Sequence, residues 1–201
     1  MLTWRADVSI EAHITLSHPA HADTALLAWL APRALKLTRI ELSSGVSSQQ
    51  PMITLWAADL DEALREARAL RDDLAALGVR VSRVKLEVIH VPGAPAAPAL
   101  YLEHHVKVST TPERVIELGP VGAAYGAYLS RNPRRRVLGV EERFLTQRFE
   151  ARDAAAAEAS LQALLGALRA AALPITKVAR ERVVHDDNLA LDAGWRPELS
   201  P

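Results

Sequence analysis

The chain repeats itself, and this internal duplication is the feature that most constrains its fold. Residues 11–17 (EAHITLS) resemble residues 103–109 (EHHVKVS) at an offset of 92 positions. Residues 81–87 (VSRVKLE) resemble residues 175–181 (ITKVARE) at an offset of 94 positions. Two similar segments that recur in the same order and at nearly the same spacing indicate a tandem repeat.

Both halves have the same predicted order of elements. Alternating polar and apolar residues predict strands, and apolar residues three or four positions apart predict helices. Strands are expected over residues 8–17, 36–43, 52–57, 79–90, 102–108, 127–132, 143–150 and 175–185. Helices are expected to begin near Asp23, Asp59, Thr111 and Asp153. The resulting β-α-β-β-α-β order predicts an α+β protein with two tandem ferredoxin-like repeats, each with an antiparallel sheet, related by a pseudo-two-fold axis.

The predicted domain boundaries follow this duplication. The units are residues 1–90 (first repeat), 91–100 (linker), 101–185 (second repeat) and 186–201 (C-terminal tail). The linker is rich in Pro and Ala, which favours a stiff, extended segment. In the tail, residues 185–188 (HDDN) predict a turn, and Leu189, Leu191 and Trp195 are expected to dock onto a repeat. The tail also resembles the ends of uncharacterised bacterial proteins, which implies no activity.

Composition excludes several classes of protein. The 201 residues include no Cys, which excludes disulfides, thiolate metal sites and a cysteine nucleophile. Lys and Arg number 24, as do Asp and Glu, and each half is close to neutral, so neither half has the field of a general polyanion binder. No apolar run approaches the length of about 18 residues that a membrane helix needs. We therefore expect a cytoplasmic protein with no membrane partner and no signal peptide.

Strand alternation predicts a polar face on each sheet, on the side away from the helices. The residues expected on these faces are Glu11, His13, Thr15, Glu87, Glu103, His105, Lys107 and Glu181. If the two faces meet, they form a polar groove between lobes that suits a small anionic ligand; otherwise they are solvated faces with surface ion pairs. The same alternation turns Arg180 and Arg182 toward the core, unless a bulge shifts the register.

His13, Thr15 and Leu16 form a His-x-Thr-hydrophobic pattern, and here the chain resembles the 2H phosphoesterase family. The resemblance implies a two-lobed hydrolase that acts on a small phosphodiester or nucleotide, with two histidines as general acid and base and hydroxyl groups that hold the phosphate. Carried over residue by residue, His13 and Thr15 match the first motif. His105 matches the second histidine, where Lys107 replaces the hydroxyl. The candidate catalytic residues are therefore His13, Thr15, His105 and Lys107.

Two other interpretations of these residues remain open. One is a non-catalytic module that binds a small ligand or a protein. The other is a metal site, because Glu11-x-His13 and Glu103-x-His105 each place a carboxylate and an imidazole on one strand face, although any alternating polar strand produces that spacing. No metal or cofactor is assigned from the sequence. The candidate ligand-binding residues are Glu11, Glu103, Arg131, Gln147 and Arg148.

The densest positive cluster is residues 130–136 (SRNPRRR), which is predicted to lie in a hairpin loop. Arg134, Arg135 and Arg136 are the one place where local contact with nucleic acid is expected. The alternative is a solvated hairpin tip. The sequence does not indicate an oligomeric state.

Overall fold

The structure is a computed structural model that describes residues 9–17, 23–89, 98–137 and 139–195, without the side chains of residues 23 and 133–137. The strands are β1 (Ile10–Ser17), β2 (Leu37–Leu42), β3 (Gln49–Ala57), β4 (Arg80–Ile89), β5 (Tyr101–Thr110), β6 (Tyr128–Val137), β7 (Val140–Glu150) and β8 (Ile175–Asp186). The helices are α1 (Asp23–Leu30), α2 (Leu60–Ala76), α3 (Val115–Ala123) and α4 (Ala154–Ala170), with short 3-10 turns η2 (Ala31–Arg33), η3 (Pro112–Arg114) and η4 (Leu189–Asp192).

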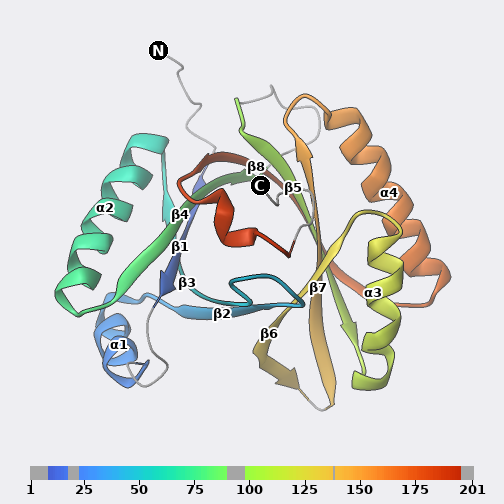
Figure 1. Ribbon diagram of the computed structural model, residues 1–201, viewed down its shortest axis with the longest axis horizontal. Coiled ribbons are helices and arrows are strands. Elements are labelled where there is room, and N and C mark those ends of the chain that lie inside the picture. The colour runs from blue at the N-terminus through green and yellow to red at the C-terminus, as the bar shows by residue number, and fades with distance from the viewer. Residues whose placement is uncertain (1–8, 18–22, 90–97, 138, 196–201) are drawn as a thin grey trace.

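The strands form one closed antiparallel barrel in the order β1-β3-β2-β6-β7-β5-β8-β4. Each half of the chain contributes four neighbouring strands. The halves join at two seams, where β2 pairs with β6 and β4 pairs with β8. Figure 1 shows α1 and α2 outside the barrel on one side and α3 and α4 outside it on the other. The helices therefore cover the outer surface, and the inner surfaces of the two halves face one another.

The prediction of two open ferredoxin-like repeats is wrong at the level of the sheets. Each half does have the element order β-α-β-β-α-β, but the two sheets join into a single barrel. An isolated four-stranded sheet exposes unpaired backbone N–H and C=O groups along its two edges, and pairing edge with edge satisfies them. Alternation along a strand predicts which face is buried but not which strand lies beside it. The closure of the two sheets into a barrel therefore cannot be predicted from the alternation of polar and apolar residues.

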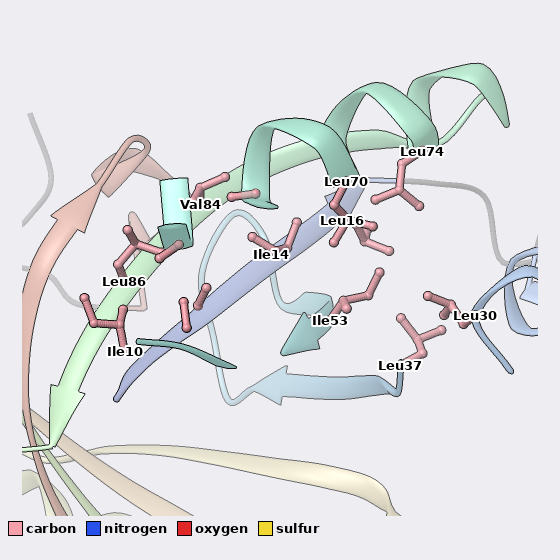
Figure 2. Close-up of a cluster of buried hydrophobic side chains, with 14 of the residues drawn as sticks. Ile10, Ile14, Leu16, Leu30, Leu37, Ile53, Leu70, Leu74, Val84 and Leu86 are labelled. Carbon is pink, nitrogen blue, oxygen red and sulfur yellow. The ribbon is translucent and has the colours of Figure 1, made fainter. Parts of the chain in front are cut away.

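Each half has its own apolar core between the barrel wall and the helices. In the first half, buried side chains of β1, β3 and β4, among them Ile10, Ile14, Ile53 and Leu86, pack beneath Leu74 of α2 (Figure 2). In the second half, β5 and β7 pack against α3 and α4, with Val106, Leu118, Leu145, Leu161 and Leu164 all buried. Because successive side chains of a strand point to opposite faces, these cores leave the alternate, polar positions pointing into the barrel.

Arg180 lies on the helix-facing side of β8, as the predicted register required. Its guanidinium donates two hydrogen bonds of 2.8 Å to the carboxylate of Glu158 on α4. The pairing of β8 also shifts register at two places, beside Lys107 on β5 and beside Leu86 on β4. An arginine on the core face is therefore accommodated by a salt bridge at the edge of the core rather than by exposure.

The basic segment predicted as a hairpin loop belongs instead to β6, which continues to Val137 before β7 begins at Val140. The side chains of Arg134, Arg135 and Arg136 lie outside those described, so local contact with nucleic acid stays a prediction.

Residues 91–97 of the predicted linker also lie outside the described residues, and the domain boundaries stay predictions. Among the described residues, no helix has the length and apolar character needed to cross a membrane.

We expect Glu158→Gln to remove an acid-sensitive contribution to stability. Hydrogen bonds from Arg180 lower the pKa of the Glu158 carboxyl from its ordinary 4.5 to about 2. Because the folded pKa is the lower one, the pair stabilises above pH 4.5 and loses its effect as the pH falls toward 2. Urea unfolding should show a loss of up to about 1 kcal/mol at pH 7 and a smaller loss at pH 3. An equal loss at both pH values would contradict this.

Candidate functional site

The barrel encloses a cavity of about 240 Å³ that is lined mainly by polar side chains. The charged residues and histidines of this lining are Glu11, His13, Arg83, Lys85, Glu87, Glu103, His105, Lys107, Arg148, Lys177, Glu181 and Asp192. All eight residues expected on the polar sheet faces are among the lining residues. The two faces therefore meet, but inside a closed barrel rather than across a groove between lobes.

The structure brings most of the predicted site residues into this cavity. Those that line it are Glu11, His13, Thr15, Glu103, His105, Lys107 and Arg148. Gln147 instead faces the helices, where its amide donates to the Tyr125 carbonyl at 2.7 Å and to the Ser160 hydroxyl at 2.8 Å. Arg131 lies at the β2–β6 seam and pairs with Glu41 at 2.5 Å. Neither of these two residues lines the cavity.

His105 is oriented by contacts at both of its ring nitrogens. Its Nδ1 lies 2.8 Å from the hydroxyl of Thr146 on β7. Its Nε2 lies 2.9 Å from a carboxylate oxygen of Glu181 on β8 and 3.5 Å from one of Glu103. Burial alone would lower the pKa of His105, but Glu181 and Glu103 raise it to about 10. The ring therefore has a fixed orientation, with Nε2 directed at two carboxylates.

His13 has the same surroundings in the other half. Its Nδ1 lies 3.3 Å from the hydroxyl of Thr54 on β3. Its Nε2 lies 2.8 Å from Glu87 and 3.7 Å from Glu11. Burial opposes a rise in the pKa of His13, and the Glu87 carboxylate nevertheless raises it. The two imidazoles share one cavity, while their assignment as proton donor and acceptor stays a prediction.

The duplication extends to the threonines, which sequence reasoning missed as a pair. Thr54 precedes Thr146 by 92 positions, the same offset that separates His13 from His105. The spacing within one strand does not indicate either threonine as a partner of a histidine, because each threonine lies on a neighbouring strand. Carrying the histidine offset along the whole chain would have found the pair.

Lys85 joins the two halves of the site. Its ammonium lies 2.5 Å from Glu87 and 2.7 Å from Glu103, and both carboxylates are only 1% exposed. Burial would raise the pKa of the Glu87 carboxyl, but Lys85 and His13 hold it below its ordinary value. Burial acts likewise on Glu103, whose pKa Arg148 and Lys85 hold well below that value. Both groups are therefore charged, although they are removed from water.

Two sets of ligand atoms in the cavity are close enough to share a metal ion. The first set comes from Glu87, Glu103, His105 and Glu181, and the second from Glu11, His13 and Glu87. Within each set, one nitrogen or oxygen of every residue lies within 4.8 Å of the others. The sequence indicated the Glu-x-His half of each set, and the barrel adds the carboxylates of β4 and β8.

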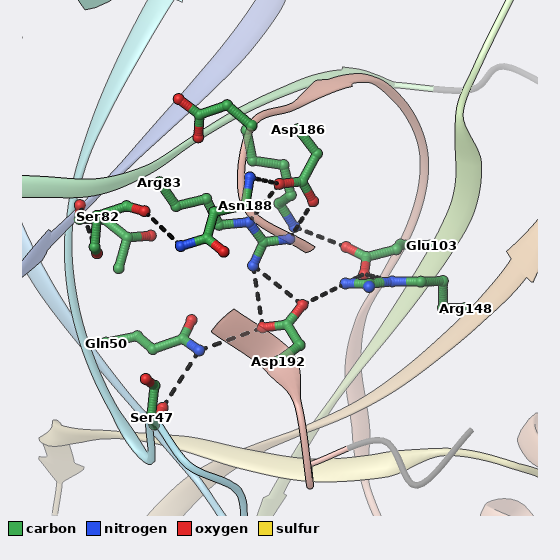
Figure 3. Close-up of polar contacts among 12 residues, drawn as sticks. Ser47, Gln50, Ser82, Arg83, Glu103, Arg148, Asp186, Asn188 and Asp192 are labelled. Carbon is green, nitrogen blue, oxygen red and sulfur yellow. Dashed lines mark hydrogen bonds and ion pairs between the residues drawn. The ribbon is translucent and has the colours of Figure 1, made fainter. Parts of the chain in front are cut away.

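The C-terminal segment covers one end of the barrel. After β8 the chain forms η4, which carries Asp192 into the interior (Figure 3). The Asp192 carboxylate accepts hydrogen bonds from Arg83 at 3.0 Å, Arg148 at 2.7 Å and Gln50 at 3.3 Å. Asp192 is 2% exposed. Sequence reasoning did not single out Asp192, because one acidic residue in a polar tail forms no pattern.

Trp195 anchors the end of this segment. Its indole N–H donates to the Leu129 carbonyl at 3.3 Å, and its ring contacts that of Tyr128. Gly45, in the loop between β2 and β3, has φ +105°, and a Cβ there would lie 2.8 Å from the Trp195 backbone nitrogen. Only glycine allows both that backbone conformation and that close approach. Leu189, by contrast, is 47% exposed.

The residues predicted to form a turn before the tail are fixed by hydrogen bonds within the turn and to β4. Asp186 accepts a hydrogen bond from the Asn188 N–H at 3.1 Å, and the Asn188 amide donates to the Ser82 carbonyl at 2.8 Å. Asp186 also accepts a hydrogen bond from Arg83 at 2.5 Å (Figure 3). A second hydrogen bond comes from the Tyr101 hydroxyl at 2.5 Å. The turn is therefore part of the buried polar network.

We expect Asp192→Asn to destabilise the protein by about 3 kcal/mol or more, because it leaves two buried guanidinium groups without their shared carboxylate. Urea unfolding at neutral pH measures this loss. Glu150→Gln is the control, since Glu150 is 64% exposed beside Arg152 and its removal should cost less than about 1 kcal/mol. Equal losses for the two variants would show that the Asp192 contacts do not support the barrel.

The two-lobed groove implied by the phosphoesterase resemblance is not what the chain forms, since both halves build one closed barrel. We therefore do not carry that activity forward.

No protein-family model matches the chain, and no curated sequence matches it. Among solved structures, a proposed monooxygenase from Fusobacterium nucleatum is 11% identical with a TM-score of 0.35, covering 93% of this chain and 95% of that one. A heme-binding protein from Thermus thermophilus is 11% identical with a TM-score of 0.33 over 89% and 91%. A mutant chlorite dismutase from Candidatus Nitrospira defluvii is 10% identical with a TM-score of 0.33 over 92% and 94%. Likenesses this distant support no conclusion about ligand or activity.

Proposed function

We propose that the barrel interior binds a divalent transition-metal ion and that this ion makes the cavity a metal-dependent site for small molecules. The observation that carries the proposal is the convergence of His105 Nε2 with carboxylate oxygens of Glu103, Glu181 and Glu87 within 4.8 Å. An imidazole together with carboxylates is a donor set typical of zinc, manganese and iron rather than of calcium or magnesium.

The distances suit an ion with these ligands. Metal bonds to histidine nitrogen and carboxylate oxygen are about 2.1 Å long, which places neighbouring ligand atoms about 3.0–3.4 Å apart in octahedral or tetrahedral geometry. His105 Nε2 lies 2.9 Å from Glu181 and 3.5 Å from Glu103. The ion would replace the proton that the imidazole now carries, with small movements of the side chains.

The contact between His105 and Thr146 supports the same proposal. Histidines that bind metals through one nitrogen usually hold the other in a hydrogen bond, which fixes the orientation of the ring. In this protein the Thr146 hydroxyl lies 2.8 Å from Nδ1, so that Nε2 is the nitrogen left for the ion.

The rest of the cavity favours a small anionic ligand beside the ion. Lys107 and Lys177 are directly opposite one another on β5 and β8, and both line the cavity. Like charges in that cross-strand position repel, and Lys107 is paired with Glu142. An anion between the two ammonium groups would relieve this repulsion. The volume of about 240 Å³ restricts such a ligand to a small molecule.

Removal of the proposed ligand nitrogen tests the metal site directly. After treatment with a chelator, the protein should bind Mn²⁺ or Zn²⁺ in isothermal titration calorimetry, and His105→Gln should weaken binding at least about tenfold. His104→Gln is the matched control, because His104 is the preceding residue of β5 and packs its ring against Phe149. The absence of metal binding, or equal weakening by both variants, would reject the proposal.

Lys85→Met should have opposite effects on the metal-free protein and on metal affinity. Without the ammonium, the buried carboxylates of Glu87 and Glu103 repel one another, so the metal-free variant should lose about 3 kcal/mol or more of stability. The metal ion then no longer competes with the Lys85 ammonium and should bind more tightly than in the wild type. Thermal unfolding with and without Mn²⁺ measures both effects, since a ligand that binds only the folded state raises the melting temperature. Unchanged metal affinity would contradict competition at this position.

A further inference from the structure

We infer that the cavity binds two metal ions, the second held by His13, Glu11 and Glu87, with the Glu87 carboxylate as the bridge between them. This inference rests on the proposed metal site at His105. It adds a second ion, a shared ligand and hence a dinuclear centre inside the barrel.

The first argument is the duplication of the ligand geometry. In one half, the histidine Nε2 lies 2.9 Å and 3.5 Å from its two carboxylates. In the other half, the corresponding distances are 2.8 Å and 3.7 Å. Each Nδ1 faces a threonine hydroxyl of the neighbouring strand, Thr146 or Thr54. A donor arrangement that suits an ion in one half is therefore present again in the other.

The second argument is the position of Glu87, which belongs to both sets of ligand atoms. Its side chain is 1% exposed, and one oxygen faces His13 while the other faces Lys85, which also contacts Glu103. Both oxygens are buried, and each is held by one ion pair, with His13 at 2.8 Å and with Lys85 at 2.5 Å. A buried carboxylate with an oxygen within 4.8 Å of the ligand atoms of each histidine set is placed to bridge two ions.

The third argument is the composition and charge of the combined set. The ligands are two imidazoles and four carboxylates, from His13, His105, Glu11, Glu87, Glu103 and Glu181. This is the ligand composition of dinuclear carboxylate centres in helical bundles, supplied here by strands. The two ions would share these four negative charges with Lys85 and Arg148, which pair with Glu87 and Glu103.

The number of ions and their coupling test this inference. Titration of chelator-treated protein with Mn²⁺ should reach two ions per chain, and electron paramagnetic resonance should show exchange coupling between them. Glu11→Gln and His13→Gln should each reduce the stoichiometry to one ion and abolish the coupling, while the ion at His105 stays bound. Glu11 is 21% exposed, so its isosteric replacement is a mild test of a protein that must still fold. His104→Gln serves as the control and should keep both ions.

The alternative results are distinguishable. One ion per chain, lost in His105→Gln and unaffected by Glu11→Gln, would overturn the dinuclear centre and leave the proposed function intact. No bound ion would overturn both. Two ions without exchange coupling would overturn the Glu87 bridge.

Discussion

The pairing of β4 with β8, together with that of β2 with β6, is the constraint on which the rest of the structure depends. These seams turn two sheets into a single barrel and remove the polar faces of both halves from bulk water. Glu87 and Glu181 lie on the two strands of one seam, so the same pairing brings together carboxylates from each half. The chemistry of the interior is thus a consequence of how the edges close.

Closure makes the charges of the interior interdependent. A buried ion pair that loses one partner leaves an uncompensated charge, which costs far more than a surface pair does. Lys85 bridges two glutamates, and Arg148 bridges Glu103 and Asp192. Lys85 thereby joins the two halves, Arg148 joins the second half to η4, and the histidines face carboxylates with fixed geometry. Such preorganisation is what a metal or small-ligand site needs.

Much of the local structure could be predicted from the sequence, and the closure could not. The alternation in β1 and β5 correctly separated Ile14 and Val106, which pack under the helices, from His13 and His105, which line the cavity. Gln147, a predicted ligand-binding residue, alternates with Leu145 and Phe149, and its strand turns that side chain toward α4 rather than into the cavity. Asp192 and Thr54 could not be identified from pattern, because their partners lie on elements distant in the chain. Partner choice between strands is a tertiary property that periodicity does not encode.

The position of Asp192 bears on the order in which the chain folds. Its carboxylate contacts Gln50 across a separation of 142 residues and Arg83 across 109. During synthesis both partners emerge long before it, so the interior guanidinium groups lack their shared anion until residue 192 has been made. Contacts between such distant positions slow folding, because the entropy of loop closure is lost before they form. The turn η4 thus completes the polar contacts of the interior, and no segment that stops before residue 192 can form all of them.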